Sequence, residues 1–308
     1  MNLSIVATLY QSSPYIEEFY QRASTAALQL TNDYEIVLVN DGSPDDSLAR
    51  AVALTTNDEH VIVIDLSRNF GHHKAMMAGL AHARGEWVFL VDSDLEEEPE
   101  WLLSFSEQMV SDKCDVVYGV QGVRKGGVFE RWSGVWYYIL YRALTGLKVP
   151  YNITTARLMS RRYVDALISF EEREIDIGGL WFITGFDQRS QVVKKHSTSE
   201  TTYTFGKKVA IIVNAVTSFS NLPLIGIFYI GIAILLVSCI WTGYLILHWF
   251  IDAQPVSGYT SLMTSIWLLG GLIISTVGVV GIYLAKVFSE TKRRPNTIIR
   301  EIYQQREQ

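Results

Sequence analysis

Two long stretches in the second half of the chain contain no Asp, Glu, Lys or Arg. They cover residues 209–251 and 253–285 of the 308-residue sequence, and Asp252 is the one charge between them. Because a helix needs about 20 apolar residues to cross the hydrocarbon core of a bilayer, each stretch is long enough for one crossing. We therefore expect an integral membrane protein with two transmembrane helices, at about 224–250 and 262–288.

Basic residues flank these stretches only on the sides away from their connector. They are Lys207 and Lys208 before the first stretch, and Lys286, Lys292, Arg293 and Arg294 after the second. The connector at 248–259 carries neither Lys nor Arg. By the positive-inside rule, the connector should face outwards and both termini should lie in the cytosol. A signal peptide is not expected, since a strand-like segment starts at Leu3.

The cysteines and the net charge restrict the classes of site and partner. Cys114 and Cys239 lie far apart, and the second falls within an expected membrane span, so they predict neither a disulfide framework nor a metal motif. The net charge of −6 argues against a general nucleic-acid partner. These features favour a reduced, cytosolic domain attached to the membrane.

The first two thirds of the chain alternate between apolar strand patterns and helical patterns. We expect strands at 3–9, 35–40, 61–66, 87–91 and 115–118, and helices at 14–30, 45–55, 75–83 and 99–110. This alternation predicts an α/β, Rossmann-like domain with a mostly parallel sheet. The expected organisation is a cytosolic domain at 1–204, a juxtamembrane amphipathic helix at 205–221, the membrane region at 222–288 and a basic cytosolic tail at 289–308.

An apolar run at 88–91 leads directly into six carboxylates within nine positions. Such a run reads as a buried parallel strand that ends at a loop. Asp92 and Asp94 alternate around Ser93, so one turn can aim both carboxylates at a common point, and hard oxygen ligands favour Mg²⁺ or Mn²⁺. The remaining Glu residues around Pro99 also suit the start of a helix. Glu96 fits either interpretation.

Polar residues follow each of the first four expected strands. They are Thr8-Leu9-Tyr10, Asp41-Gly42-Ser43, Ser67-Arg68-Asn69 and Asp92-Ser93-Asp94. In an open α/β sheet, ligands bind at this edge, where Tyr10 could stack on a base and Asp41 could accept a hydrogen bond from a base. Asp41 could equally be a turn or cap residue. Neither G-x-G-x-x-G nor G-x-x-x-x-G-K-[ST] occurs, which argues against a dinucleotide cofactor and a P-loop.

Taken in order, these segments resemble the family 2 glycosyltransferases, and specifically the polyprenyl-phosphate glycosyltransferases. The matching segments are Thr8–Tyr10, Val39–Ser43, Arg68–Gly71, Val91–Leu95 with Pro99-Glu100, Thr217–Leu224 and Lys292–Pro295. The resemblance implies a GT-A fold and inverting sugar transfer from a UDP-, GDP- or dTDP-sugar to polyprenyl (undecaprenyl) phosphate. The transfer would take place at the cytosolic face of a bacterial inner membrane, and its product would serve envelope glycan modification. A homo-oligomer, by analogy a tetramer, is also implied.

The resemblance also assigns roles to individual residues. The nucleotide would be held by Thr8, Leu9, Tyr10, Asp41, Gly42, Arg68, Lys74 and Asp92. The metal would be held by Asp92, Asp94 and Glu96. The diphosphate and the lipid phosphate would be held by Arg124, Arg131, Arg157, Lys195, His196 and Tyr203. Asp92, Asp94 and Arg157 would be catalytic, since the guanidinium fork meets phosphate oxygens bidentately. For each arginine, the alternative is a solvated surface charge.

The sequence departs from the family pattern in three places. Thr8-Leu9-Tyr10-Gln11-Ser12 keeps only the Tyr of the usual Pro-x-Tyr-Asn-Glu start. Thr154-Thr155-Ala156 precedes Arg157 where many relatives carry an acidic residue, and Lys195 or His196 stands where they carry an arginine. The identity of the sugar and the nucleotide is therefore left open. A processive polysaccharide synthase, a nucleotidyltransferase and a non-catalytic membrane scaffold are the alternatives. The Gln-x-x-Arg-Trp segment of processive synthases does not occur in this sequence. The glycine-rich loop that nucleotidyltransferases carry near the N-terminus is also missing.

Overall fold

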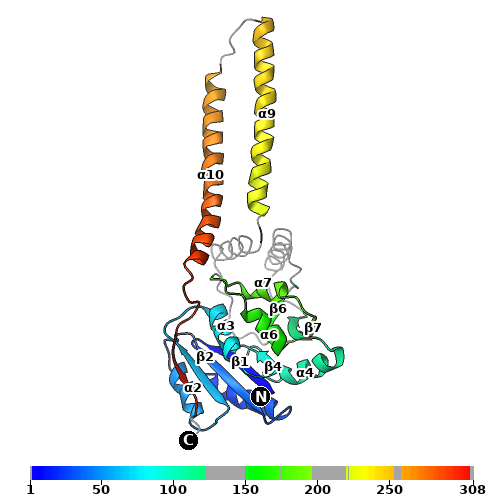
Figure 1. The fold of residues 1–308 in the computed structure, drawn as a ribbon, viewed down its shortest axis with the longest axis vertical. Helices are drawn as coiled ribbons and strands as arrows, with labels where there is room; N and C mark the ends of the chain where they lie inside the picture. Colours follow the sequence, from blue (N-terminus) through cyan, green and yellow to red (C-terminus); the bar gives the residue numbers. More distant parts are fainter. Residues whose placement is uncertain are drawn as a thin grey trace. The chain divides into compact units, whose positions relative to one another are not determined.

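The computed structural model describes residues 2–122, 150, 152–173, 175–195, 220, 222–252 and 258–305 (Figure 1). Two compact units make up the chain. The first, which we call the α/β unit, comprises Met1–Ile139, Leu147–Thr204 and Arg294–Gln308. The second, the helical unit, comprises Leu140–Gly146 and Phe205–Arg293.

The α/β unit is built on an eight-stranded sheet with the order β7-β5-β6-β4-β1-β2-β3-β8. Its centre consists of β1 (Leu3–Leu9), β2 (Tyr34–Asn40), β3 (Val61–Leu66) and β4 (Trp87–Leu90). These four strands pair in parallel, and nearly every residue in them is buried. The predicted α/β class and mostly parallel sheet are confirmed. The strands are continuous apolar runs because both faces of the sheet are covered.

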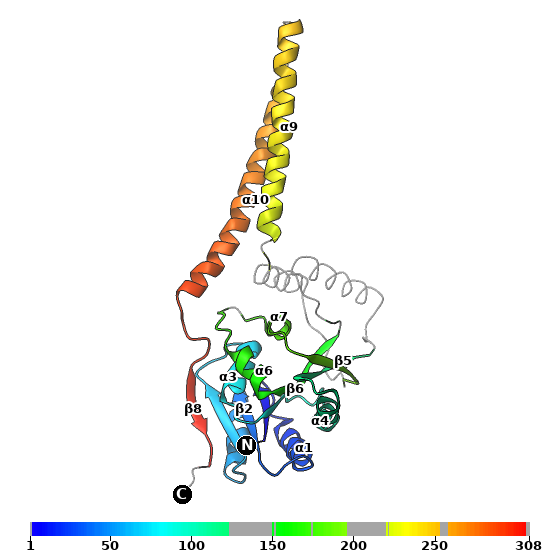
Figure 2. The ribbon, with the colours of Figure 1, turned by 45° about the vertical axis from the view of Figure 1, so that its right-hand side comes forward.

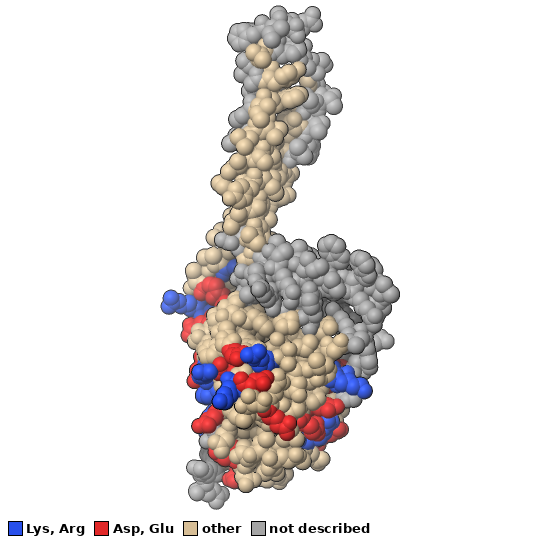
Figure 3. All heavy atoms as spheres, turned by 90° about the vertical axis from the view of Figure 1, so that its right-hand side faces the viewer, with Lys and Arg blue, Asp and Glu red and all other residues tan. Residues whose placement is uncertain are grey.

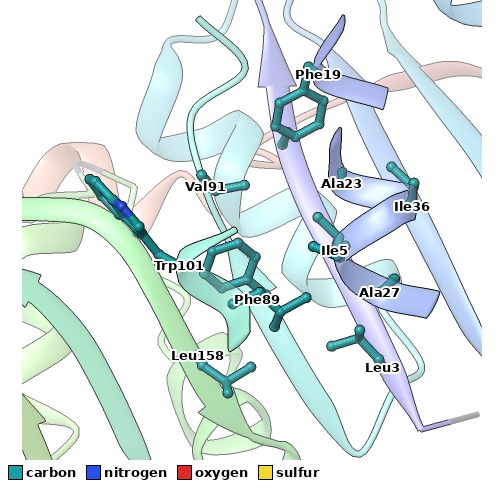
Figure 4. Packing of buried hydrophobic residues seen from close by; sticks show 14 of the residues in the cluster. Leu3, Ile5, Phe19, Ala23, Ala27, Ile36, Phe89, Val91, Trp101 and Leu158 are labelled. Carbon is teal, nitrogen blue, oxygen red and sulfur yellow. The ribbon is translucent and has the colours of Figure 1, made fainter. Parts of the chain in front are cut away.

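Helices cover both faces of the sheet. They are α1 (Ile16–Leu28), α2 (Ser47–Thr55), α3 (His72–His82) and α4 (Trp101–Asp112). On one face, Phe19 and Ala23 of α1 pack against alternate residues of β1 such as Ile5 (Figure 4). On the other face, α3 approaches β1 and β2 closely at Gly79, where a Cβ would collide with the side chains of Val6 and Val39.

The second half of the sheet is mixed, whereas the strand and helix pattern predicts a mostly parallel sheet. Here β6 (Ile153–Ser160) lies antiparallel between β4 and β5 (Val116–Gln121), and β7 (Gln188–Val193) pairs with β5. The helices α6 (Arg161–Ile168) and α7 (Ile177–Ile183) lie between β6 and β7 in sequence. The sequence predicted no element at 153–193, because polar residues interrupt the apolar run of β6 and no strand period is visible.

The C-terminal tail completes the sheet. Residues of β8 (Ile299–Tyr303) pair antiparallel with β3 at the edge of the sheet (Figure 2). Arg300 donates to Asp65 (Nη1–Oδ2 3.0 Å) and to the carbonyl of Ser67 (Nη2–O 2.7 Å), and buried Asp65 also accepts from Asn40 (2.8 Å). We expect a separate basic tail at 289–308; the structure instead shows that part of this segment, β8, belongs to the sheet.

The described part of the helical unit contains two long helices, α9 (Leu222–Asp252) and α10 (Tyr259–Thr291). Their described surfaces are largely uncharged (Figure 3). Within the described residues, one segment, Leu269–Thr291, is long and apolar enough to cross a membrane. Both predicted spans are helical, whereas the crossing by α9 stays a prediction. Except for residue 220, the predicted juxtamembrane helix at 205–221 lies outside the described residues.

Asp45 ties the loop before α1 to the start of α2. Its carboxylate accepts hydrogen bonds from the hydroxyls of Ser43 and Ser47 (2.5 Å each) and from the amides of Ser47 (3.1 Å) and Ser13 (3.2 Å). Burial by itself would raise the pKa of Asp45, but these hydrogen bonds outweigh it and lower the pKa to about 2. The ionised form is therefore the one that stabilises the fold.

We expect Asp45→Ala to lower the free energy of unfolding by about 1 kcal/mol near pH 7, as for a lost helix cap. Since the folded-state pKa of Asp45 is depressed to about 2, this contribution is present above the unfolded pKa and is lost as the pH falls towards 2. Thermal unfolding at pH 7 and pH 3 tests this, with Asp46→Ala as control because Asp46 makes no side-chain cap hydrogen bond. Equal losses at both pH values would contradict the prediction.

Candidate functional site

The loops that follow β1 and β4 are joined directly. The buried hydroxyl of Ser93 donates to the carbonyl of Thr8 (2.8 Å) and shares a second hydrogen bond with the hydroxyl of Ser12 (3.0 Å). Because β1 and β4 are parallel neighbours, these loops leave the same edge of the sheet. Ser93 therefore fixes the turn from which Asp92 and Asp94 project.

Asp92 is linked to α3 through His72. The imidazole of His72 lies between Asp92 (Nε2–Oδ1 3.3 Å) and Thr8 (Nδ1–Oγ1 3.0 Å). Burial by itself would raise the pKa of Asp92, but the hydrogen bond and charge of His72, together with the charge of Lys195, hold it below its usual value. His72 is absent from the predicted site residues because the helix was expected to begin at residue 75. The position of His72 directly after the Arg68–Gly71 segment could have indicated its role.

Asp94 and Glu96 continue the acidic turn. The amide of Glu96 donates to Asp94 (N–Oδ1 3.0 Å), and Leu95 between them has a left-handed φ of 59°. For a residue with a Cβ, this conformation costs roughly 1–2 kcal/mol. Burial raises the pKa of Asp94, and the negative charges of Asp92 and Glu96 add to this effect. The carboxylates are thus close enough to repel each other.

Glu97 is a fully buried carboxylate that sequence reasoning assigned to a helix start. It accepts hydrogen bonds from two amides of β6, those of Thr155 (Oε1, 3.0 Å) and Ala156 (Oε2, 2.7 Å). Burial raises the pKa of Glu97 to about 7, and the charge of Asp92 adds to the shift. No sequence signal pointed to this role, since its partners lie on a strand far along the chain.

Lys195, which follows β7, contacts the same acidic turn. Its ammonium lies 3.2 Å from Glu96 (Oε2) and 3.5 Å from Glu97 (Oε1). Burial would lower the pKa of Lys195, but the charges of Glu97 and Asp92 and the hydrogen bond to Glu96 outweigh it and raise the pKa. The predicted phosphate-binding lysine is thus placed beside the predicted metal ligands.

The residues at this turn are compatible with a divalent cation. Oδ1 of Asp92 is buried and, apart from the ion-pair contact with His72, has no hydrogen-bond partner in the described part of the chain. Among all residues that the structure describes, no group of three or more His, Cys, Asp or Glu side chains is arranged to hold a metal. Mg²⁺ is usually held by one or two carboxylates, with substrate phosphates and water as the other ligands. Asp92 and Asp94 can supply that pair.

Asp41 anchors the loop between β3 and α3. Its two carboxylate oxygens accept from the amides of Phe70 (2.7 Å) and Gly71 (3.0 Å), and burial raises its pKa despite these hydrogen bonds. Gly42 next to it has a φ of 60°, and a Cβ there would collide with the backbone of Arg68 and Asn69. Asp41 therefore acts as a turn residue that holds this loop. Each of its carboxylate oxygens still has a second lone pair that a ligand could use.

The other predicted nucleotide residues lie around the same edge with different accessibility. The side chain of Leu9 is fully buried in the core, whereas Tyr10 is 50% exposed. The guanidinium of Arg68 is exposed and lies 4.2 Å from the ring centre of Phe70. Lys74 lies in the first turn of α3. An exposed aromatic ring and two cations therefore border the loops that Asp41 and Asp92 fix.

Arg157 is not a surface residue. It lies on β6, opposite Leu90, is fully buried, and its guanidinium stacks on the ring of Trp181 from α7. It donates to the carbonyl of Thr155 (Nε–O 3.2 Å), and burial lowers its pKa to about 9. Its Nη1 is buried without a hydrogen-bond partner in the described segments. Arg124, Arg131, His196 and Tyr203 lie outside the described residues.

Comparisons with known proteins show the family to which the chain is similar. A family model described as Glycosyl transferase family 2 matches residues 4–168. A Mycobacterium tuberculosis protein named among glycosyltransferases is 51% identical, with 98% of this chain and 89% of that protein covered. The prophage bactoprenol glucosyl transferase homolog of Escherichia coli is 30% identical, with 98% and 99% covered. Among solved structures, the M. tuberculosis glucosyl-3-phosphoglycerate synthase bound to Mn²⁺, UDP and glucosyl-3-phosphoglycerate is 19% identical over 71% of this chain and 80% of that one (TM-score 0.47).

Proposed function

The chain belongs to glycosyl transferase family 2, and we propose that it transfers a sugar from a nucleotide-sugar to a polyprenyl phosphate such as undecaprenyl phosphate. The observation that carries the proposal is the fixed Asp92–Asp94 turn at the ligand-binding edge of the sheet. Similarity over nearly the whole of a protein named as a bactoprenol glucosyl transferase homolog supports the lipid acceptor.

On the donor side, the residues of the chain bind and orient the nucleotide. Tyr10 offers an exposed ring for stacking on a base, and Asp41 offers a lone pair to a base N–H. Asp92 and Asp94, with Glu96 as a third candidate, would hold Mg²⁺ or Mn²⁺. When bound, this cation neutralises the departing nucleoside diphosphate. Arg68 and Lys74 add positive charge at the same edge.

On the acceptor side, the reaction needs positioning more than proton transfer. A lipid monophosphate, like a phosphorylated side chain, is largely ionised near neutral pH, so its oxygen attacks without a general base. The new bond from this oxygen to the anomeric carbon forms as the bond to the diphosphate breaks, and the electron pair leaves on the diphosphate. Arg157 and Lys195, with Arg124, Arg131, His196 and Tyr203 as further candidates, would hold the two anions in line.

The position of β8 supports the two-span topology. Because β8 pairs with β3, the residues after α10 lie on the same side of the membrane as the sheet. An odd number of crossings would separate them, so a crossing by α10 calls for a second crossing, and α9 is the other long helix among the described residues. By the positive-inside rule, the flanking Lys and Arg residues support a cytosolic location for the α/β unit and both termini, and the envelope chemistry supports a bacterial inner membrane.

Cysteine labelling tests this topology. In a variant without the native cysteines, we expect Gln254→Cys to react with a membrane-impermeant maleimide in intact spheroplasts. Ser111→Cys on α4 and Gln304→Cys after β8 should react only after permeabilisation, because both belong to the α/β unit. Labelling of positions 254 and 304 from the same side would contradict the two-span arrangement.

A transfer assay tests the function. Purified protein is incubated with radiolabelled nucleotide-sugars and a short polyprenyl phosphate, and we expect label to move into the organic phase only with the matching donor. A processive polysaccharide synthase would instead give a water-soluble polymer, and a scaffold would give neither product.

Light scattering of the purified protein tests the proposed homo-oligomer, for which a tetramer is the expectation by analogy.

A further inference from the structure

The ammonium of Lys195 occupies the acidic turn where a divalent cation is proposed to bind. It lies 3.2 Å from Glu96 and 3.5 Å from Glu97, and its side chain is only 22% exposed. The two glutamates belong to the loop after β4, whereas Lys195 follows β7. The contact therefore joins two segments that are distant in sequence, and Lys195 is held at the turn from outside the acidic segment.

Charge explains why a cation is held there. Asp92, Asp94, Glu96 and Glu97 lie within six positions of one another, so their negative charges repel each other. The ammonium of Lys195 contacts the carboxylates of Glu96 and Glu97 and so opposes this repulsion. In the absence of a metal, the lysine thus supplies part of the positive charge that the turn requires.

We propose that Lys195 is a resident counter-cation that competes with the divalent ion for this turn and is displaced when the ion binds at Asp92 and Asp94. The proposal rests on the proposed function, which supplies the metal. Like charges in a partly buried site repel strongly, so each cation weakens the binding of the other, and this coupling is reciprocal. The displaced ammonium, on its flexible stem, becomes available to an anion such as the acceptor phosphate.

Binding of Mn²⁺ alone tests the competition without measuring activity. The full-length protein in detergent is titrated with Mn²⁺, and free Mn²⁺ is followed by electron paramagnetic resonance. We expect Lys195→Met and Lys195→Gln to bind Mn²⁺ roughly tenfold more tightly than the wild type, because a competing charge is gone. Lys195→Arg, which keeps the charge, should bind like the wild type. Lys194→Met is the matched control, since Lys194 is an exposed neighbour with the same charge.

The outcomes separate this inference from the metal site itself. If Asp92→Asn abolishes Mn²⁺ binding but the neutral Lys195 variants bind no more tightly than Lys194→Met, the competition is overturned and the metal site stands. If neither the wild type nor the neutral Lys195 variants bind Mn²⁺ through Asp92, both proposals fail. Tight, Asp92-dependent binding that appears only in the neutral Lys195 variants would support both.

Discussion

Replacing Asp92 with Asn should lower sugar transfer by about 10³-fold or more while the protein still folds and inserts. The carboxylate is held by His72 at the ligand-binding edge, and its Oδ1 lacks any other partner in the described residues. Loss of a cation that neutralises a leaving diphosphate removes several kcal/mol of transition-state stabilisation, and each 1.36 kcal/mol is tenfold in rate. The rate of label transfer into the organic phase measures the effect at saturating donor and metal.

Asp165→Asn is the matched control for this variant. Asp165 is exposed on α6 and, among the described residues, forms an ion pair with Arg161 in the same helix (2.8 Å) and with no other residue; such surface pairs contribute little to stability. We expect its transfer rate to stay within about twofold of the wild type. Full activity in Asp92→Asn, with unchanged folding, would refute the role assigned to the acidic turn.

Replacing Glu97 with Ala should produce the largest loss of stability among single substitutions at the site. It would leave the part-buried amide of Thr155 and the buried amide of Ala156 without acceptors and would remove a partner of Lys195. Orphaned buried donors cost about 1–3 kcal/mol each, so we expect a loss of about 3 kcal/mol in the free energy of unfolding. For a domain of this size, this corresponds to a fall in Tm of about 6–12 °C.

Glu97→Gln refines this prediction, since its amide oxygen can still accept one of the two hydrogen bonds. We expect it to lose about half as much stability as Glu97→Ala. Glu107→Ala, at an exposed position on α4, removes a carboxylate without these contacts and should leave Tm nearly unchanged. If Glu97→Ala unfolded within about 1 °C of the wild type, Glu97 would not be the link between the acidic turn and β6.

The central half of the fold could be predicted from the sequence because its signals are local. The bounds of β1 and β3 agree with the expected strands, since each is an apolar run that ends at polar turn residues. In contrast, β6 and β8 carry charged and polar residues and become strands by pairing with β4, β5 and β3. Such pairing depends on contacts between distant segments, which no local pattern reveals.

The candidate site divides in the same way. Asp92 and Asp94 could be predicted because they follow a buried strand directly, and parallel topology brings strand ends together. The roles of His72 and Glu97 could not, because they depend on side-chain contacts across loops. Arg157 and Lys195 were selected for phosphate binding; the structure buries the first and pairs the second with carboxylates. Their phosphate roles stay predictions.

The most direct test of the account is a two-product measurement on the purified, lipid-reconstituted protein. With the matching nucleotide-sugar, we predict that free nucleoside diphosphate and organic-soluble labelled sugar appear in equal amounts, that both require polyprenyl phosphate, and that EDTA stops both. Nucleoside diphosphate released without labelled lipid, or inorganic diphosphate released in its place, would contradict the proposed transfer to a lipid phosphate.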